Sequence, residues 1–310
     1  MLYFIVNEKS KSGNAKQIWK EIEEVLKVRN VSYQAFVSEY RGHAGKLATE
    51  ICAMDDNDIC LVAVGGDGTA NEVINGITDF EKVRFGVIPT GSGNDLARGL
   101  SLSKDPKNGA IHILNAMKKS REDTWCMDLG EVNFGEKKRL FAISAGIGLD
   151  ALVCKKALKS TIKDILNKIR LGKLTYLVLT VQSLFTMQTA DAEIFFDREE
   201  GLQKKRMIFT AAMNFKAEGG GVPMAPAASA CDGKLSFCEA AGIPKWRTFL
   251  CLPFLVAAKH TSIHGFSVTD AKDCTIRLSR PMVVHADGEY CGEVTEVHFH
   301  WLPGKLRVLK

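Results

Sequence analysis

The stretch VAVGGDGTANEVINGI, residues 62–77, constrains the fold of this chain more than any other. An apolar run ends at three glycines and an aspartate, and a segment with helical spacing of apolar residues follows. Strand, glycine turn and helix in this order are typical of a parallel α/β sheet, in which ligands bind beyond the carboxyl ends of the strands. Glycine permits positive φ and close approach of a ligand, and N–H groups at a helix start suit phosphate. The stretch therefore predicts a phosphate-binding turn.

Similar turns occur at two other places. FGVIPTGSGNDLARGL (85–100) again runs from a strand through a glycine turn into a helix, with Asn94 or Asp95 as the expected helix cap. NEKSKSGN (7–14) follows the apolar run LYFIVN and is a third polar turn with glycine. Neither GxGxxG nor GxxxxGK[ST] is present. Three such turns on one edge of a sheet nevertheless predict a nucleotide cleft.

The pattern changes near residue 125. Before it, strand runs alternate with helical patterns, which predicts an α/β nucleotide-binding domain over 1–125. After it, short apolar segments follow one another, with helical insertions near 155–187 and 244–260. This predicts a mostly antiparallel β-sandwich domain over 126–310, and a two-domain α+β protein overall. The strands expected there are CMDLGEV, RLFAISAGIG, AEIFFD, RMIFTAAMN, KLSFCEAA, CTIRLS, MVVHADGE and TEVHFHWL.

Composition narrows the function classes. The chain of 310 residues is 46% hydrophobic and 25% charged, which suits a globular protein with ample core. A net charge of +5 is too small to indicate a nucleic-acid partner. Nine cysteines without a CxxC pair, behind a strand-like amino terminus, favour reduced thiols in a cytoplasm. The longest apolar stretches are shorter than the ~20 residues of a spanning helix.

GGDGTANEV followed by PTGSGNDLAR resembles the diacylglycerol kinase catalytic domain family, in the branch of soluble bacterial lipid kinases to which sphingosine and ceramide kinases are related. The resemblance covers nearly the whole chain and departs from the family at Ser92, where Thr is usual. It implies a phosphofructokinase-like nucleotide domain, a β-sandwich domain and an active site between them. It also implies that the last residues, about 298–310, return to the first domain, which we leave open here.

The resemblance implies ATP and Mg²⁺ as cofactors, because phosphoryl transfer depends on positioning and on neutralising phosphate charge. Asp67 and Asp95 are the candidate metal-contacting carboxylates, and for Asp67 the alternative is a turn-forming role. The nucleotide-binding residues implied are Asn7, Ser10, Gly13, Ser38, Gly65, Gly66, Asp67, Gly68, Thr69, Asn71, Glu72, Thr90, Gly91, Asn94 and Asp95.

HADGE (285–289) looks like the late catalytic stretch of the family, although DG alone is also a common hairpin turn. Asp287 or Glu289 is then the general base that takes the proton of a lipid hydroxyl, and the choice stays open. In related enzymes the segment around CDGK carries a structural Mg²⁺. Asp232 matches its aspartate, and Ser229 and Lys234 fall where main-chain ligands would be.

The expected reaction is transfer of the γ-phosphoryl group of ATP to a diacylglycerol-like lipid at the inner membrane surface. The basic and then apolar segment 158–185 is either a cover on the sandwich or an interfacial element that contacts anionic lipid. The basic residues expected to contact lipid are Lys159, Lys163, Lys168, Arg170 and Lys173. The alternative functions are an NAD kinase and an inactive lipid-binding homologue, and a homodimer is left open.

Overall fold

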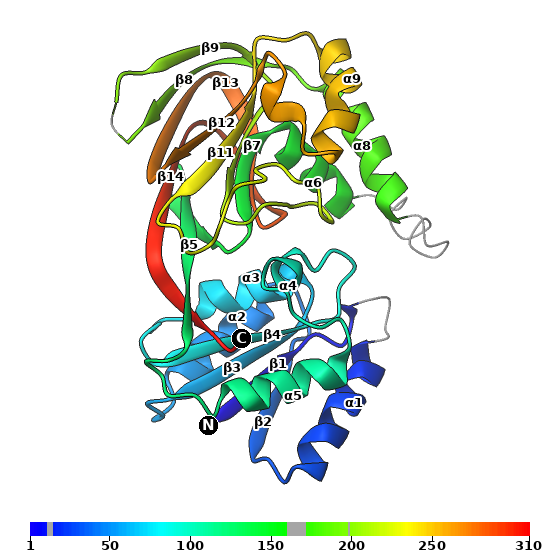
Figure 1. Ribbon diagram of the computed structural model, residues 1–310, viewed down its shortest axis with the longest axis vertical. Helices are drawn as coiled ribbons and strands as arrows, with labels where there is room; N and C mark the ends of the chain where they lie inside the picture. Colours follow the sequence, from blue (N-terminus) through cyan, green and yellow to red (C-terminus); the bar gives the residue numbers. More distant parts are fainter. Residues whose placement is uncertain (11–14, 160–171, 198) are drawn as a thin grey trace. The chain divides into compact units, whose positions relative to one another are not determined.

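The computed structural model describes residues 1–10, 15–159, 172–197 and 199–310. The chain divides into two compact units, Met1–Asp128 with Pro303–Lys310 (unit 1) and Leu129–Leu302 (unit 2) (Figure 1). Among the described residues, no helix is both long and apolar enough to cross a membrane.

Unit 1 is built on a parallel sheet in the order β2-β1-β3-β4. These strands are almost entirely apolar, and all but β2 are buried along their whole length, as expected for a sheet covered on both faces. The last residues of β14 (Glu289–Val308) lie beside β4, also in parallel. The bounds of the four strands are Leu2–Val6 for β1, Tyr33–Val37 for β2, Ile59–Gly65 for β3 and Val83–Pro89 for β4.

Helices cover this sheet through apolar side chains at helical spacing. In α1 (Ala15–Val28), Trp19, Ile22 and Leu26 are buried and share a core with α5 (Pro106–Ala116), β1 and β3. Helices α2 (His43–Cys52) and α3 (Asp67–Gly76) pack so closely that a Cβ on Gly76 would lie 2.1 Å from the carbonyl oxygen of Gly45. A short helix, α4 (Asp95–Gly99), follows β4.

Two helices of unit 1, α2 and α5, were not predicted from the sequence. Each contains a glycine, which lowers helix propensity by about 1 kcal/mol relative to alanine, and packing outweighs that cost. For α5 a local signal was present. The side chain of Asp105 accepts the N–H of Asn108 at 2.7 Å, and Pro106 occupies the first helical position.

Unit 2 is antiparallel, in the order β12-β11-β10-β7-β13-β14, with β8 and β9 continuing from β13, and β5 and β6 from β14. A single apolar core joins these strands to the helices. The strand bounds are Trp125–Phe134, Lys137–Phe141, Ser144–Gly148, Ala190–Phe196, Leu202–Met207, Phe209–Met213, Leu235–Ala240, Phe266–Ala271 and Asp273–Ala286 for β5 to β13 in order. The helices are α6 (Leu149–Lys159), α8 (Gly172–Thr186), α9 (Lys245–Val256) and the 3-10 turn η2 (His260–Ser262).

Two predicted strand boundaries in this unit are wrong. RLFAISAGIG is two strands, β6 and β7, because the N–H groups of residues 142–144 donate to the carboxylate of Asp287 and not to a neighbouring strand. CTIRLS and MVVHADGE belong to one strand, β13, whose register shifts between Arg277 and Met282. Pro281 lies in that interval and has no N–H to donate, which accounts for the shift.

Candidate active site

The three polar turns predicted at the carboxyl ends of the strands meet in unit 1. The side-chain amide of Asn7, after β1, donates to the hydroxyl of Thr69 at 3.0 Å. The hydroxyls of Ser10 and Thr90 are 2.6 Å apart, and the Thr90 N–H donates to the carbonyl of Gly65 at 2.8 Å. Ser10, Thr69 and Thr90 therefore line one locus where β1, β3 and β4 end.

The glycines of these turns are needed for close approach. A Cβ on Gly91 would lie 2.7 Å from the Cα of Gly66, and a Cβ on Gly65 would lie 2.5 Å from the Cβ of Thr69. None of Gly65, Gly66, Gly68 and Gly91 has a positive φ, so of the two properties of glycine it is close approach that these turns use. The two turns touch backbone to backbone, and side chains there would force them apart.

Helix α3 begins directly at the first glycine turn. Gly66 is its N-cap residue and offers no side-chain hydrogen bond, and Asp67 and Gly68 form its first turn. The first N–H groups of a helix have no partner within the helix, and the partial positive charge there favours an anion. The start of α3 therefore has the chemistry of a phosphate site at the place predicted from the sequence.

Asp67 joins the two glycine turns. Its Oδ1 accepts the N–H of Leu96 at 3.1 Å, and its Oδ2 lies 2.9 Å from the point that a Cβ on Gly93 would occupy. The carboxylate of Asp95 is buried and pairs with the guanidinium of Arg98. Both carboxylates thus lie at the β3 and β4 turns, where a divalent cation on a bound phosphate would find oxygen ligands.

Asn94 does not cap α4 with its side chain. It precedes the helix at φ 53°, and its amide instead accepts the Gly91 N–H at 2.9 Å and donates to the Gly91 carbonyl at 2.8 Å. The predicted cap position is therefore occupied by Asn94, but its side chain closes the glycine turn and makes no cap hydrogen bond.

The other predicted nucleotide residues are held inside unit 1. Ser38 is buried at the end of β2, where its N–H donates to the carbonyl of Val6. Asn71 is 1% exposed, and its carbonyl accepts the side-chain amide of Asn75. Glu72 Oε1 accepts the Gly42 N–H at 2.8 Å and ties α3 to the start of α2. Gly13 lies outside the described residues.

The ADGE stretch of unit 2 forms the hairpin between β13 and β14. Asp287 and Gly288 have φ values of 48° and 81°, as a two-residue turn of type I′ requires. The buried carboxylate of Asp287 accepts three backbone N–H groups, from Ala142 at 2.9 Å, Ile143 at 2.8 Å and Ser144 at 3.1 Å. Oδ1 takes two of these bonds and Oδ2 takes one. Glu289, opposite Ala286 in the hairpin, is half-buried.

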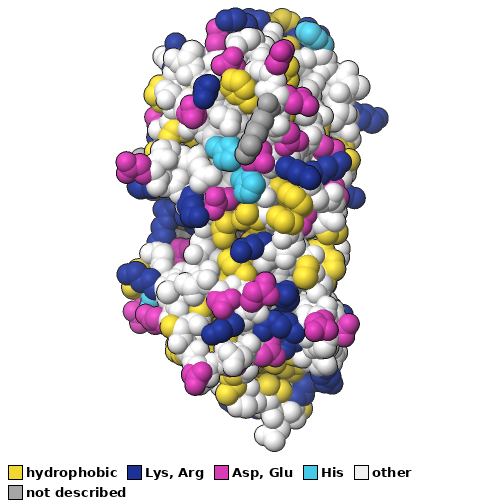
Figure 2. All heavy atoms as spheres, turned by 90° about the vertical axis from the view of Figure 1, so that its left-hand side faces the viewer, with side chains coloured by type: hydrophobic (Ala, Val, Ile, Leu, Met, Phe, Trp, Pro, Cys, Tyr) yellow, Lys and Arg dark blue, Asp and Glu magenta, His cyan; other side chains and the backbone are white. Residues whose placement is uncertain are grey.

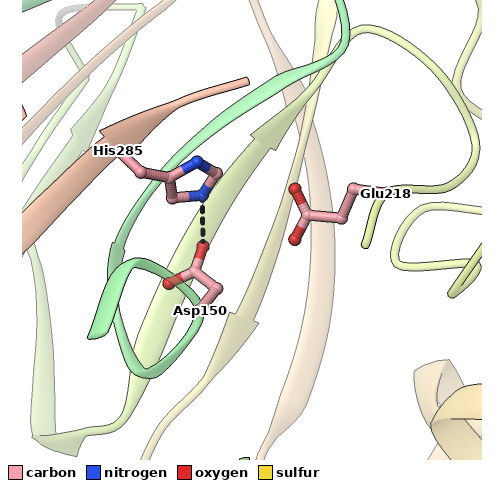
Figure 3. Close-up of side chains that lie close together, drawn as sticks. All are labelled: Asp150, Glu218 and His285. Carbon is pink, nitrogen blue, oxygen red and sulfur yellow. Dashed lines mark hydrogen bonds and ion pairs between the residues drawn. The ribbon is translucent and has the colours of Figure 1, made fainter. Parts of the chain in front are cut away.

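Three further polar side chains gather beside this hairpin and were not predicted from the sequence. Ligand atoms of Asp150, Glu218 and His285 all lie within 4.8 Å of one another (Figure 3). His285 Nε2 and Asp150 Oδ2 are 3.1 Å apart, and the Ser144 hydroxyl donates to Glu218. A Cβ on Gly146 would lie 1.9 Å from Asp150 Oδ2, so glycine in β7 leaves the space for this pair.

Hydrogen bonds decide where the His285 ring carries its proton. The Gly288 N–H donates to Nδ1 at 3.2 Å, so the proton of a neutral ring sits on Nε2 and is donated to Asp150. A metal at Nε2 would have to displace that proton. The arrangement of Asp150, Glu218 and His285 therefore favours a buried hydrogen-bond network over a metal site. Burial lowers the pKa of His285, but the hydrogen bond to Asp150 and the nearby carboxylates raise this pKa above its usual value overall.

The segment predicted to carry a structural Mg²⁺ is an exposed loop before β11. Asp232 is exposed, and Gly233 adopts a φ of 87°. The Lys234 ammonium pairs with Asp270 at 2.6 Å, and the Ser229 hydroxyl lies 3.5 Å from Cys231 Sγ. Among the residues that the structure describes, the cluster of three metal-ligating side chains is Asp150, Glu218 and His285, which does not include Asp232. A metal here would depend on main-chain oxygens, and the site stays a prediction.

Comparison with protein families assigns both parts of the chain. Residues 1–127 match the diacylglycerol kinase catalytic domain, and residues 144–310 match the YegS C-terminal NAD kinase beta sandwich-like domain. The chain is 30% identical over 311 residues to YtlR of Bacillus subtilis, which is named as a lipid kinase, and the match covers 99% of this chain and 98% of that protein. It is 28% identical over 256 residues to a diacylglycerol kinase of the same organism, covering 81% and 76%.

Solved structures agree on the fold. A crystal structure assigned as a diacylglycerol kinase from Bacillus anthracis matches with a TM-score of 0.77 at 22% identity, over 99% of this chain and 96% of that chain. An NAD kinase from Archaeoglobus fulgidus in complex with ATP matches with a TM-score of 0.53 at 14% identity, over 97% and 90%. The predicted nucleotide-binding α/β domain followed by a β-sandwich is confirmed. The chain is a kinase that belongs to the diacylglycerol kinase catalytic domain family, in the branch that carries the YegS-type β-sandwich.

Proposed function

We propose that this protein is an ATP- and Mg²⁺-dependent lipid kinase whose acceptor is the hydroxyl of a diacylglycerol-like lipid. The bond between the γ-phosphorus and the β–γ bridging oxygen breaks, a bond from the lipid oxygen to that phosphorus forms, and ADP and phosphatidic acid or an analogue leave. The observation that carries the proposal is the convergence of three polar turns at the carboxyl ends of β1, β3 and β4, beside the uncapped start of α3.

Unit 1 would handle the phosphoryl donor. N–H groups at the start of α3 bind the phosphates, and Ser10 and Thr90 supply hydroxyls at the same locus. Mg²⁺ prefers carboxylate and phosphate oxygens, and Asp67 is the side chain best suited to it. Asp95 already pairs with Arg98, so its share in holding the metal requires that this pair open or that the contact run through water.

Unit 2 would remove the proton of the acceptor hydroxyl. A carboxylate serves as a general base if it can hydrogen-bond to that hydroxyl during transfer. Oδ2 of Asp287 accepts one backbone N–H whereas Oδ1 accepts two, and Glu289 lies half-buried at the end of the same hairpin. Both residues therefore qualify as the base, and we expect their substitution to affect stability differently. Because the acceptor would be a membrane lipid, we propose that the protein acts from the cytoplasm at the inner surface of the membrane.

A second candidate is an NAD kinase, favoured by the GGDGT turn and by the fold shared with the Archaeoglobus fulgidus enzyme. One assay separates the two. The purified protein is incubated with γ-labelled ATP and Mg²⁺ over a panel of lipids and with NAD⁺. Label in a lipid product, lost when EDTA removes the metal, supports the proposal. Label only in NADP⁺ overturns it, and no label in either product favours an inactive homologue.

A further inference from the structure

Helix α9 has large apolar side chains on the face that points away from the core. Thr248, Cys251 and Leu255 are buried and hold the helix on unit 2. On the opposite face, five large side chains are between 40% and 65% exposed: Trp246, Phe249, Leu250, Phe254 and Val256. A helix that is apolar all round is normally enclosed by protein or lipid, so this outer face is unusual for a surface helix.

The neighbouring helix α8 extends this face. Leu177, Val178 and Phe185 are each about half exposed, at 50%, 51% and 50%. The rings of Phe185 and Phe249 lie 6.1 Å apart, and the Lys245 ammonium at the start of α9 donates to the carbonyl of Met187, just past α8. The two helices lie side by side in unit 2 (Figure 1). Their exposed apolar side chains therefore form one surface, which we name the α8–α9 face.

Helices α8 and α9 carry basic but no acidic residues. Neither helix contains Asp or Glu. Arg247 is exposed within α9, Lys245 is partly exposed at its start, and Lys259 is exposed just after its end. On the face seen in Figure 2, by contrast, side chains of both signs are interspersed. An apolar aromatic surface whose described charged side chains, in and next to α9, are basic complements an anionic bilayer interface.

We infer that the α8–α9 face docks this protein on the surface of an anionic bilayer. Trp246 and Phe254 enter the interface between headgroups and acyl chains, where large amphipathic and aromatic rings are favourable, and Arg247 and Lys259 meet the anionic headgroups. Because no helix among the described residues is suited to span a bilayer, the contact is interfacial. The inference rests on the proposed function in one respect only, since docking would bring the protein to a lipid acceptor. It also places the expected basic contacts in and next to α9 rather than in segment 158–185. The basic residues predicted there, Lys159, Lys163, Lys168, Arg170 and Lys173, lie outside the described side chains.

The test uses the full chain and vesicles of phosphatidylcholine with or without phosphatidylglycerol. We expect the protein to co-sediment with the anionic vesicles, and salt to weaken this binding. The double variant Trp246→Ser/Leu250→Ser should lose at least about tenfold in vesicle partitioning, because each removed side chain contributes apolar area. Arg247→Glu should weaken binding to anionic vesicles and leave binding to neutral vesicles unchanged. The matched control is Leu202→Ser, which removes a comparably exposed leucine, 49% exposed, from β9 of the same unit.

Other outcomes overturn the inference. Equal vesicle binding by the double variant and the wild type places the contact elsewhere. A wild type that is dimeric by analytical ultracentrifugation, with a monomeric double variant and no vesicle binding, makes the face an interface between copies. Phosphoryl transfer to a detergent-dispersed lipid separates docking from catalysis. If docking alone is wrong, transfer persists while vesicle binding is absent, and if the proposed function is wrong, transfer is absent while vesicle binding remains measurable.

Discussion

At the scale of single residues, one carboxylate can shape a turn and face a substrate, and a sequence motif does not separate these roles. The Asp287 carboxylate accepts the backbone N–H groups of residues 142–144, which lie 143 to 145 residues before it in the chain. Asp67 likewise accepts the Leu96 N–H while standing at the start of α3. The polar contacts that hold these side chains also decide what a substitution will do.

Asp67→Asn should lower phosphoryl transfer by at least ~10²-fold, as expected when a preorganised electrostatic contact is lost. The asparagine amide can keep an oxygen toward the Leu96 N–H, so the fold should persist. The measurement is kcat as a function of Mg²⁺ concentration, with circular dichroism for the fold. Asp55→Asn, at an exposed position, is the control. Normal turnover in folded Asp67→Asn would remove this residue from the mechanism.

Asp287→Asn and Glu289→Gln should differ in stability. In Asp287→Asn, the side-chain amide nitrogen would face a backbone N–H. A buried donor then loses its acceptor, which lowers the free energy of unfolding by ~1–3 kcal/mol. Glu289→Gln should stay within ~0.5 kcal/mol of the wild type. Removal of the general base should lower kcat by about 10²–10⁴-fold in one of the two, with ATP affinity unchanged.

Urea unfolding and steady-state kinetics test both variants, and Glu296→Gln, exposed on the same strand, is the control. Equal unfolding midpoints in Asp287→Asn and the wild type would contradict the structural role given to Asp287. Full kcat in both variants would place the base elsewhere, with Asp67 or Asp95 as the next candidates.

His285 should make stability depend on pH. Its folded-state pKa is raised overall, because the hydrogen bond and charge of Asp150 outweigh burial. Protonation of the ring therefore stabilises the fold below its unfolded pKa of about 6.5, and this contribution is lost as the pH rises through the folded pKa. The difference in urea midpoint between the wild type and His285→Gln should shrink as the pH rises from acid to alkaline. His264→Gln, at an exposed position, should show no such trend.

At the scale of elements, the glycine turns work because two of them touch. The Gly66 and Gly91 backbones meet at the ends of β3 and β4, and Asn94 closes the second turn with hydrogen bonds to Gly91. The strand pair is thereby fixed at the point where the nucleotide is expected to bind. In unit 2, hydrogen bonds also separate two strands. The run ends between β6 and β7 because the N–H groups of residues 142–144 donate to the Asp287 carboxylate.

Gly91→Ala should destabilise unit 1 by ~1–3 kcal/mol, because its Cβ would lie 2.7 Å from the Cα of Gly66 and 2.9 Å from Asn94 Oδ1. ATP binding should weaken with it. Gly109→Ala is the matched control, since its Cβ in α5 would meet Ile88 at an ordinary 3.5 Å and helix propensity favours alanine by up to ~1 kcal/mol. Urea unfolding and ATP titration measure both variants, and a Gly91→Ala protein as stable as Gly109→Ala would refute the close approach.

At the scale of the whole molecule, the end of the chain belongs to the first unit. Residues 303–310 group with residues 1–128, and β14 pairs with β13 in unit 2 and with β4 in unit 1. Leu309 is fully buried in the core of the parallel sheet, and its N–H donates to the Phe85 carbonyl at 2.8 Å. The stability of the amino-terminal unit therefore depends on the carboxyl-terminal residues.

Leu309→Ala should cost unit 1 ~2–5 kcal/mol, the range for a large-to-small change in a core. Hydrogen exchange should show faster exchange of amides in β1, β3 and β4, while β10 and β11 in unit 2 keep their protection. Arg307→Ala removes an ion pair with Glu81, whose side chain is highly exposed, and should change stability by no more than ~1 kcal/mol. Uniform loss of protection in both units after Leu309→Ala would show that they unfold as one.

The strand–turn–helix pattern of the first unit, the antiparallel character of the second and the positions of the polar turns were all predictable from the sequence alone. These properties depend on the spacing of apolar residues and on glycine positions, and both can be recognised within a short stretch of sequence. Tertiary packing determines which turns touch, that β14 pairs with strands of both units, and that His285 meets Asp150, 135 residues away along the chain. It also determines that the outer side of α9 is exposed. The reason is physical: such contacts depend on strand register and on the packing of distant segments, and apolar side chains look the same in sequence whether they face a core or a bilayer.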